Sequence, residues 1–307
     1  CYINLPPGDK AAREAELTPE EILDIARQAV DMGAVWCLVT GGEPLLREDF
    51  PEIYLGLKRL GLLVGVFTNA CLVTPADVAL FKEYPPRDIE VTVYGATRET
   101  YEAVTRRAGS WRAFTRGLDL LLDAGIKVRL KAMALRSNAH ELDEISSFCR
   151  ERTKDFYRFD PLLHLRFDGD PVRNEEIKAE RLSPEEIVAI ERADRTRFEA
   201  LQNECEKGEI FCPELEHQSR DHLFQCGAGA DGFSVGYDGT FRLCSSLWHP
   251  GTTYDLRAGT LREAWEEWVP HVRDLRGAGA GFLERCRRCA LVNLCLWCPA
   301  HAALPAD

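Results

Sequence analysis

Helix-like and strand-like segments alternate five times between residues 17 and 168. The expected helices are 18–32, 50–60, 75–83, one that ends near 125, and 139–152. The strands expected after them are, in the same order, 35–39, 63–67, 89–94, 128–134 and 156–162. Thr18-Pro19-Glu20-Glu21 has the signals that begin a helix, and the strand ranges are short apolar runs. Such repetition predicts an α/β fold with parallel strands in an open sheet or a barrel, and five units favour a partial barrel.

Composition and charge narrow the classes of partner. A chain of 307 residues can bury a sizeable core and divide into two domains. The net charge of −12 argues against a nucleic-acid partner and favours a basic peptide or a small substrate. The sequence contains neither an apolar run long enough to span a membrane nor a signal peptide at its start. We therefore expect a cytoplasmic protein with no membrane partner.

The twelve cysteines are unevenly distributed. Seven of them lie between Cys212 and Cys298, where the chain is also rich in glycine. Cytosolic cysteines are kept reduced, so metal binding explains this concentration better than disulfides do. The second half therefore has the composition of a small domain that a metal centre stabilises.

Polar residues and glycines follow or interrupt the ends of the predicted strands in the first half. Ligands collect at the carboxyl ends of parallel strands, so we expect these residues to share one face. Gly41 and Gly42 would let the backbone approach a ligand, and Glu43 could accept an ammonium group; a plain tight turn with a solvated Glu43 is the alternative. The candidates are Gly41, Gly42, Glu43, Pro44, Thr68, Asn69, Thr92, Lys131 and Asn138.

Gly41-Gly42-Glu43-Pro44 resembles the motif with which the radical S-adenosylmethionine (SAM) superfamily binds the amino group of SAM. The resemblance spans residues 1–168 and implies a partial (β/α)6-type barrel. Thr92 and Arg106 would contact the SAM carboxylate, although an exposed helix arginine is the alternative for Arg106. Cys1 resembles the last of three cysteines that hold a [4Fe–4S] cluster, which implies two ligands upstream. The chain alone would then be inactive.

The cysteines of the second half resemble the SPASM domain, an auxiliary cluster domain of peptide-modifying radical SAM enzymes. The pattern is Cys226-x12-Gly239-x4-Cys244 followed by Cys286-x2-Cys289-x5-Cys295-x2-Cys298. The resemblance implies one or two auxiliary [4Fe–4S] clusters, one held by Cys226, Cys244, Cys298 and Cys212, the other by Cys286, Cys289 and Cys295. The fourth ligand of this second cluster would lie after Asp307, so the chain would be truncated at both ends. Two C-x2-C pairs also fit a zinc ribbon.

The resemblance implies a barrel at 1–168, a linker and bridging helix at 169–210 and a SPASM domain at 211–307. Within this scheme, 169–182 is expected to be a linker and 183–201 a helix. The enzyme would form a 5′-deoxyadenosyl radical and crosslink or oxidise a precursor peptide or protein, with an electron donor such as flavodoxin or ferredoxin. Two alternatives remain, a sulfatase-maturating enzyme that forms formylglycine and a zinc-stabilised, non-catalytic binding protein.

Overall fold

The structure is a computed structural model. It describes residues 9–154, 158–161, 163–166, 170–211, 222–224, 226–277 and 284–285, with the side chains of Arg158 and of 204–211 left out. The described residues divide into two compact units. The first unit comprises residues from 18 to 166 and from 170 to 187, and the second comprises residues 9–17 and those from 188 onward.

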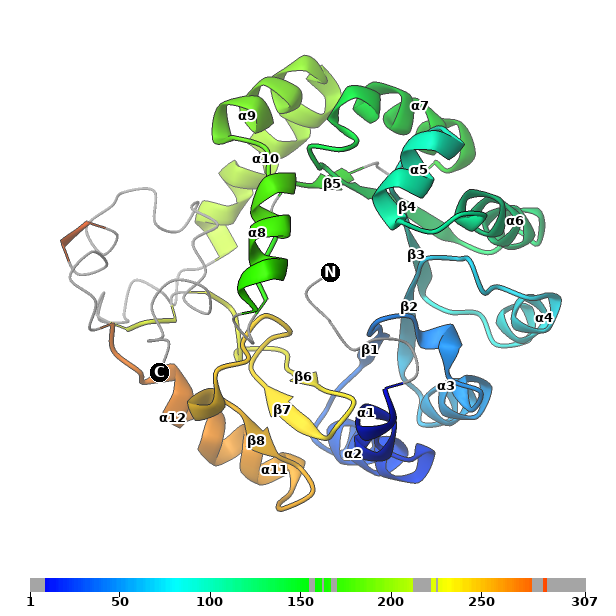
Figure 1. Ribbon diagram of the computed structural model, residues 1–307. Coiled ribbons are helices and arrows are strands. Elements are labelled where there is room, and N and C mark those ends of the chain that lie inside the picture. The colour runs from blue at the N-terminus through cyan, green and yellow to red at the C-terminus, as the bar shows by residue number, and fades with distance from the viewer. Residues whose placement is uncertain are drawn as a thin grey trace. The chain divides into compact units, whose positions relative to one another are not determined.

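A five-stranded parallel sheet in the order β1-β2-β3-β4-β5 is the centre of the first unit. This arrangement confirms the predicted α/β fold. Figure 1 shows the strands in succession, with helices such as α3, α4 and α6 along the outer side of the sheet. The elements are α2 (Pro19–Asp31), β1 (Trp36–Val39), η1 (Pro44–Leu46), α3 (Phe50–Arg59), β2 (Leu63–Thr68), α4 (Pro75–Glu83), β3 (Asp88–Val93), α5 (Arg98–Thr105), α6 (Ser110–Asp123), β4 (Val128–Met133), η2 (Ala139–Glu141), α7 (Leu142–Arg152), β5 (Arg158–Asp160) and α8 (Pro171–Glu180).

Local sequence signals explain where the helices begin. Thr18 and Glu21 form a reciprocal capping box at the start of α2, as the sequence predicts. Thr74 and Asp77 form a second one at the start of α4. Both helices have proline in the first turn, where its missing N–H is not needed. These signals place the helix starts within a residue or so of the predicted positions.

The two faces of the sheet differ in character because successive side chains of a strand point to opposite sides. On one face β2, β3 and β4 contribute apolar side chains that are almost completely buried. They are Val64, Val66, Ile89, Val91, Val93, Val128, Leu130 and Ala132. The alternate positions include Phe67, Glu90, Thr92 and Lys131. The helices therefore pack on the apolar face, and the polar positions line the opposite one.

The chain after β5 is more helical than the sequence predicts. Residues expected as a linker contain α8, because the Asp170 side chain accepts a hydrogen bond from the Arg173 N–H and Pro171 begins the helix. The single helix expected at 183–201 is two helices, α9 (Pro184–Ala193) and α10 (Arg195–Phe211). Weak amphipathic periodicity hid α8, since its described core contribution is Ile177 alone.

Besides α10 and most of α9, the second unit contains short elements, and the elements described after Cys212 are all short, as the sequence predicts. The short elements are α1 (Lys10–Ala15), β6 (Ser234–Val235), β7 (Thr240–Arg242), η4 (Pro250–Thr252), β8 (Tyr254–Asp255), α11 (Leu261–Glu263), η5 (Ala264–Trp268) and α12 (Val269–Arg273). The three strands form an antiparallel sheet in the order β6-β7-β8. Leu17 is buried, and its N–H donates to the Tyr237 carbonyl at 2.7 Å. The segment before α2 thus belongs to this unit despite its distance in sequence.

Among the described residues, no helix combines the length and apolar character that a membrane crossing requires.

Candidate active site at the carboxyl ends of the strands

Parallel pairing brings the ends of β1 to β4 to one edge of the sheet. Gly41–Pro44 follow β1, and Thr68 is the last residue of β2. Thr92 of β3 pairs in register with Lys131 of β4. The sequence prediction that these residues share one edge is therefore consistent with the sheet topology.

Glu43 connects the ends of β1 and β2. Its carboxylate accepts hydrogen bonds from the Thr68 hydroxyl at 2.7 Å, the Asn69 N–H at 2.7 Å and the Leu45 N–H at 3.2 Å. The residue is 9% exposed, so the alternative of a solvated Glu43 is wrong. Burial raises the pKa of Glu43, while the three hydrogen bonds oppose that change. We infer that this carboxylate shapes the loop and holds it against β2.

The two glycines before Glu43 are exposed and have free space around them. A Cβ added to Gly41 or Gly42 would meet no atom within 4 Å, and both residues are exposed. Gly41 has φ +145°, a backbone conformation that favours glycine. Pro44 is buried and begins η1. The loop therefore presents exposed backbone at the strand ends, with space for a ligand to approach it closely.

The turn after β2 is fixed by its own side chains and by α6. The Asn69 side chain accepts a hydrogen bond from the Cys71 N–H at 2.9 Å, and the Thr68 hydroxyl accepts one from Ala70 at 3.1 Å. Ala70 is fully buried and has φ +61°. Gly117 of α6 permits this packing, because a Cβ there would lie 1.8 Å from the Ala70 carbonyl oxygen. Sequence reasoning missed Gly117, for which a glycine within an amphipathic helix is the available signal.

Asn138 fixes the ends of β3 and β4 relative to one another. Its amide donates to the carbonyls of Tyr94 and Met133, both at 3.0 Å. Its side-chain oxygen accepts from the Leu135 N–H at 2.8 Å. The residue is fully buried. These contacts give Asn138 a positioning role beside the candidate site.

Lys131 lies among acidic and aromatic side chains on the polar face of the sheet. Its ammonium is 2.8 Å from Glu90 and 3.5 Å from Asp160, and lies 4.7 Å from the centre of the Phe67 ring. Lys131 is 16% exposed and Glu90 only 4%. A buried charge needs a partner of opposite charge, so Lys131 and Glu90 each stabilise the other in this position. The sequence signal for Glu90 is a charge at an alternating position of an otherwise apolar strand.

Thr92 and Arg106 differ in the contacts that their side chains make with other described residues. Within the described residues the Thr92 hydroxyl has no hydrogen-bond partner, and the residue is half-buried. Arg106 ends α5 with φ +55°, and its exposed guanidinium pairs with Glu176 of α8 at 3.3 Å. Arg106 thus matches the expected alternative of an exposed arginine. Its part in SAM binding stays a prediction.

The predicted cluster ligands lie mostly outside the described residues, which include only Cys226 and Cys244. Cys226 is exposed and Cys244 is half-buried, and neither forms a disulfide with another described residue. The residues outside are Cys1, Cys212, Cys286, Cys289, Cys295 and Cys298. No group of three or more potential metal ligands occurs in the part of the chain that the structure describes. Gly239 has φ +86° in the turn between β6 and β7, which explains glycine at that position of the cysteine pattern.

The fold resembles those of solved proteins bound to S-adenosylmethionine or to a precursor peptide. The crystal structure of Streptococcus suis SuiB bound to S-adenosylmethionine superposes with a TM-score of 0.62 at 17% identity, over 91% of this chain and 65% of that chain. The structure of SuiB bound to its precursor peptide SuiA superposes with a TM-score of 0.62 at 15% identity, over 96% of this chain and 66% of that chain. Native anSMEcpe with bound AdoMet superposes with a TM-score of 0.59 at 15% identity, over 91% of this chain and 79% of that chain. At these identities the likeness concerns the fold.

A curated relative provides a sequence match. Molybdenum cofactor biosynthesis protein 1 of Drosophila melanogaster is 30% identical over 190 residues, which are 61% of this chain and 32% of that protein. The chain thus spans about a third of that relative's length. The family pattern described as Radical SAM superfamily matches residues 1–149, which include the Gly41–Pro44 loop and the strand ends described above. This chain therefore carries a radical SAM superfamily domain at residues 1–149.

Proposed function

We propose that this chain is the catalytic and auxiliary-cluster part of a radical SAM enzyme that modifies a ribosomally made peptide or protein, by crosslinking or side-chain oxidation. The observation that carries the proposal is the edge of the sheet where Glu43 holds the open Gly41-Gly42 backbone beside Thr68 and Asn69. The family match covers this edge. Further support comes from the likeness to SuiB, which has been solved with a precursor peptide.

The residues at this edge fit the SAM methionyl group. The exposed backbone carbonyls of Gly41 and Gly42 can accept hydrogen bonds from the amino group, while Glu43 keeps the loop in place. The Thr92 hydroxyl is available to a carboxylate on the same edge. When bound, SAM and a reduced [4Fe–4S] cluster supply a radical that removes a hydrogen atom from the substrate. The chain's own task is placement and the exclusion of water.

The second unit would hold one or two auxiliary [4Fe–4S] clusters. Thiolate ligands suit iron–sulfur clusters, and the exposed Cys226 and half-buried Cys244 fit this use. The proposed set also includes Cys212, Cys286, Cys289, Cys295 and Cys298. Electrons would come from an external donor such as flavodoxin or ferredoxin.

The test is reductive cleavage of SAM by the full-length protein, reconstituted without oxygen and given a chemical reductant. We expect formation of 5′-deoxyadenosine, and transfer of label from a deuterated precursor peptide into it. Thr92→Val keeps the shape of the side chain and removes one hydrogen bond to the cofactor, so the apparent SAM affinity should fall about tenfold. Absence of 5′-deoxyadenosine from a protein that contains its full complement of clusters would refute the proposal.

A small-molecule substrate is the second candidate. It is favoured by the relative that takes its name from molybdenum cofactor biosynthesis. The two candidates differ in what accelerates SAM cleavage. Stimulation by a precursor peptide encoded beside this protein supports the peptide candidate. Stimulation by small-molecule extracts alone, with no label transfer from peptide, supports the other.

A further inference from the structure

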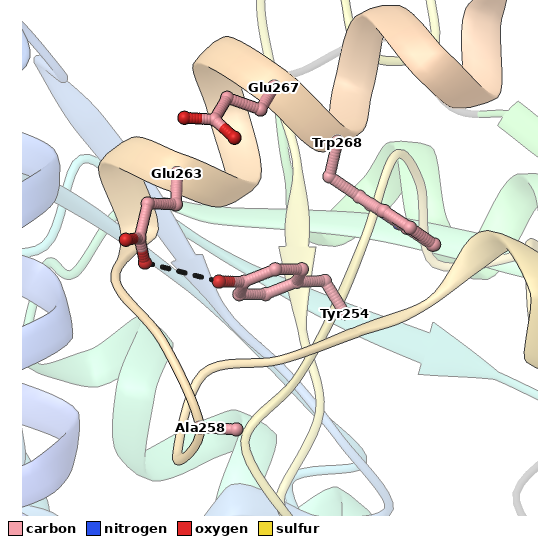
Figure 2. Close-up of a pocket in the computed structure, with 5 residues that line it drawn as sticks. All are labelled: Tyr254, Ala258, Glu263, Glu267 and Trp268. Carbon is pink, nitrogen blue, oxygen red and sulfur yellow. Dashed lines mark hydrogen bonds between the residues drawn. The ribbon is translucent and has the colours of Figure 1, made fainter.

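A pocket in the second unit combines two carboxylates with two aromatic rings. It has a volume of about 460 Å³ and is lined by Tyr254, Ala258, Glu263, Glu267 and Trp268. Figure 2 shows Glu263, Glu267 and Trp268 extending from one helical segment, with the Tyr254 ring below them and its hydroxyl directed at Glu263. Tyr254 comes from β8, Glu263 ends α11, and Glu267 and Trp268 belong to η5.

The Tyr254–Glu263 wall of the pocket is fixed before any ligand binds. The Tyr254 hydroxyl donates to Glu263 at 3.2 Å, and the same carboxylate accepts from the Thr260 N–H at 2.8 Å in a capping box. Gly259 makes this wall possible, because a Cβ there would lie 1.8 Å from the Tyr254 hydroxyl oxygen and 2.9 Å from Glu263. A larger residue at 259 would displace the tyrosine. The ring therefore occupies a defined position at the pocket.

The other wall depends on a π-helical turn. Residues Ala264–Trp268 form η5, in which hydrogen bonds join residues five apart. Glu267 and Trp268 of this turn line the pocket together with Glu263. The Tyr254 and Trp268 ring centres are 6.1 Å apart at an angle of 52°. Short π-helical segments occur frequently at functional sites.

The electrostatics of the pocket favour a cation. Its lining includes two carboxylates and no basic residue. Arg262, which precedes Glu263 in the chain, is paired with Glu266 at 2.6 Å. Glu263 and Glu267 both contribute to raising the pKa of Tyr254, after burial, which reflects the negative field at its hydroxyl.

We propose that this pocket binds the guanidinium group of an arginine side chain from the peptide substrate. Arginine has a planar cation that stacks on aromatic rings and pairs with carboxylates at the same time. The chain's net charge of −12 also favours a basic partner. That the arginine belongs to a substrate peptide rests on the proposed function, whereas the chemistry of the pocket does not.

The first test uses the full-length protein and two small probes, N-acetyl-arginine amide and its uncharged counterpart N-acetyl-citrulline amide, titrated by ligand-observed NMR. The informative variant is Glu267→Gln. The matched control is Glu266→Gln, which removes the same charge from the neighbouring residue outside the pocket lining. We expect Glu267→Gln to weaken binding of the arginine probe about threefold to tenfold and Glu266→Gln to change it less than twofold.

Two outcomes would overturn the proposal. One is equal binding of the arginine and citrulline probes by the unchanged protein. The other is an equal effect of both glutamine variants, which would indicate a general attraction of basic compounds to an acidic protein. Gly259→Ala provides a second variant, because displacement of Tyr254 should weaken binding of the arginine probe while Glu267 keeps its charge.

The proposed function can fail independently of this pocket. If the arginine probe binds as expected but no peptide is ever modified, the pocket stands and the peptide-modifying function does not. If peptide modification occurs and the probe does not bind, only the pocket proposal fails.

Discussion

Thr68→Val should loosen the first unit without changing the size of the side chain. The substitution removes a hydroxyl that donates to Glu43 at 2.7 Å and accepts from the Ala70 N–H at 3.1 Å. A hydrogen bond to a charged group contributes about 1.5–3 kcal/mol, and a buried N–H left without a partner costs about 1–3 kcal/mol. Valine in a strand offsets part of this loss. We therefore expect the free energy of unfolding of this unit to fall by about 2–4 kcal/mol.

Hydrogen–deuterium exchange by mass spectrometry measures this effect within one molecule. Peptides covering β2 and the following turn should lose protection by about thirtyfold to several hundredfold, since about 1.4 kcal/mol corresponds to a factor of ten. Peptides covering α11 and α12 of the second unit serve as the internal reference and should exchange at an unchanged rate.

Thr92→Val is the matched variant on the neighbouring strand. Because the Thr92 hydroxyl has no partner among the described residues, this variant should change the exchange protection of the strand peptides less than threefold. Its effect should instead be the weaker SAM binding expected above. Unchanged protection in Thr68→Val, or equal losses in both valine variants, would refute the role given to the Glu43–Thr68 contact.

Three further predictions follow from contacts or pKa values of individual residues. Gly117→Ala should lower the melting temperature of the first unit by several degrees in calorimetry, because its Cβ would clash with the Ala70 carbonyl oxygen; an unchanged melting temperature would contradict this packing. Arg136, hydrogen-bonded to Glu186, lowers the pKa of Glu186 to about 2. This contact therefore stabilises the fold above the ordinary glutamate pKa and loses that contribution as pH falls through about 2. Arg136→Gln should return the Glu186 pKa toward 4.5 in a carboxyl NMR titration, and no upward shift would argue against the pair. Burial raises the pKa of Cys37 to about 11 and of Cys149 to about 12, so iodoacetamide at pH 8 should modify exposed Cys226 much faster in the metal-free protein, as measured by peptide mass spectrometry; comparable rates would contradict this order.

The parallel sheet was predictable from the sequence because its strands are buried on one face by helices with clear start signals. Thr18 and Glu21 predict the start of α2 correctly, and the apolar runs predict β1 to β4 within a residue or two. Helix α8 was missed because Ile177 is its sole described buried residue, and Asp170 caps it without a strong apolar stripe. A cap alone is a weaker signal than a periodic apolar face.

The candidate site was predictable as a list of residues but not as a set of roles. Sequence position placed Glu43 at the strand ends, yet only the fold shows that Thr68 and Asn69 surround its carboxylate. Asn138 likewise becomes a link between β3 and β4 through backbone carbonyls that have no sequence signature. Hydrogen bonds to distant backbone atoms depend on tertiary structure, so single-sequence patterns do not specify them.

Metal content is the decisive test of our proposal that the second unit holds iron–sulfur clusters. Iron, acid-labile sulfide and zinc should be measured after anaerobic reconstitution, in the unchanged protein and in a variant with Cys226→Ala and Cys244→Ala. We expect iron and sulfide equivalent to at least one auxiliary cluster per chain, and the loss of both in the variant. Stoichiometric zinc without sulfide would contradict it and favour a zinc-stabilised binding protein.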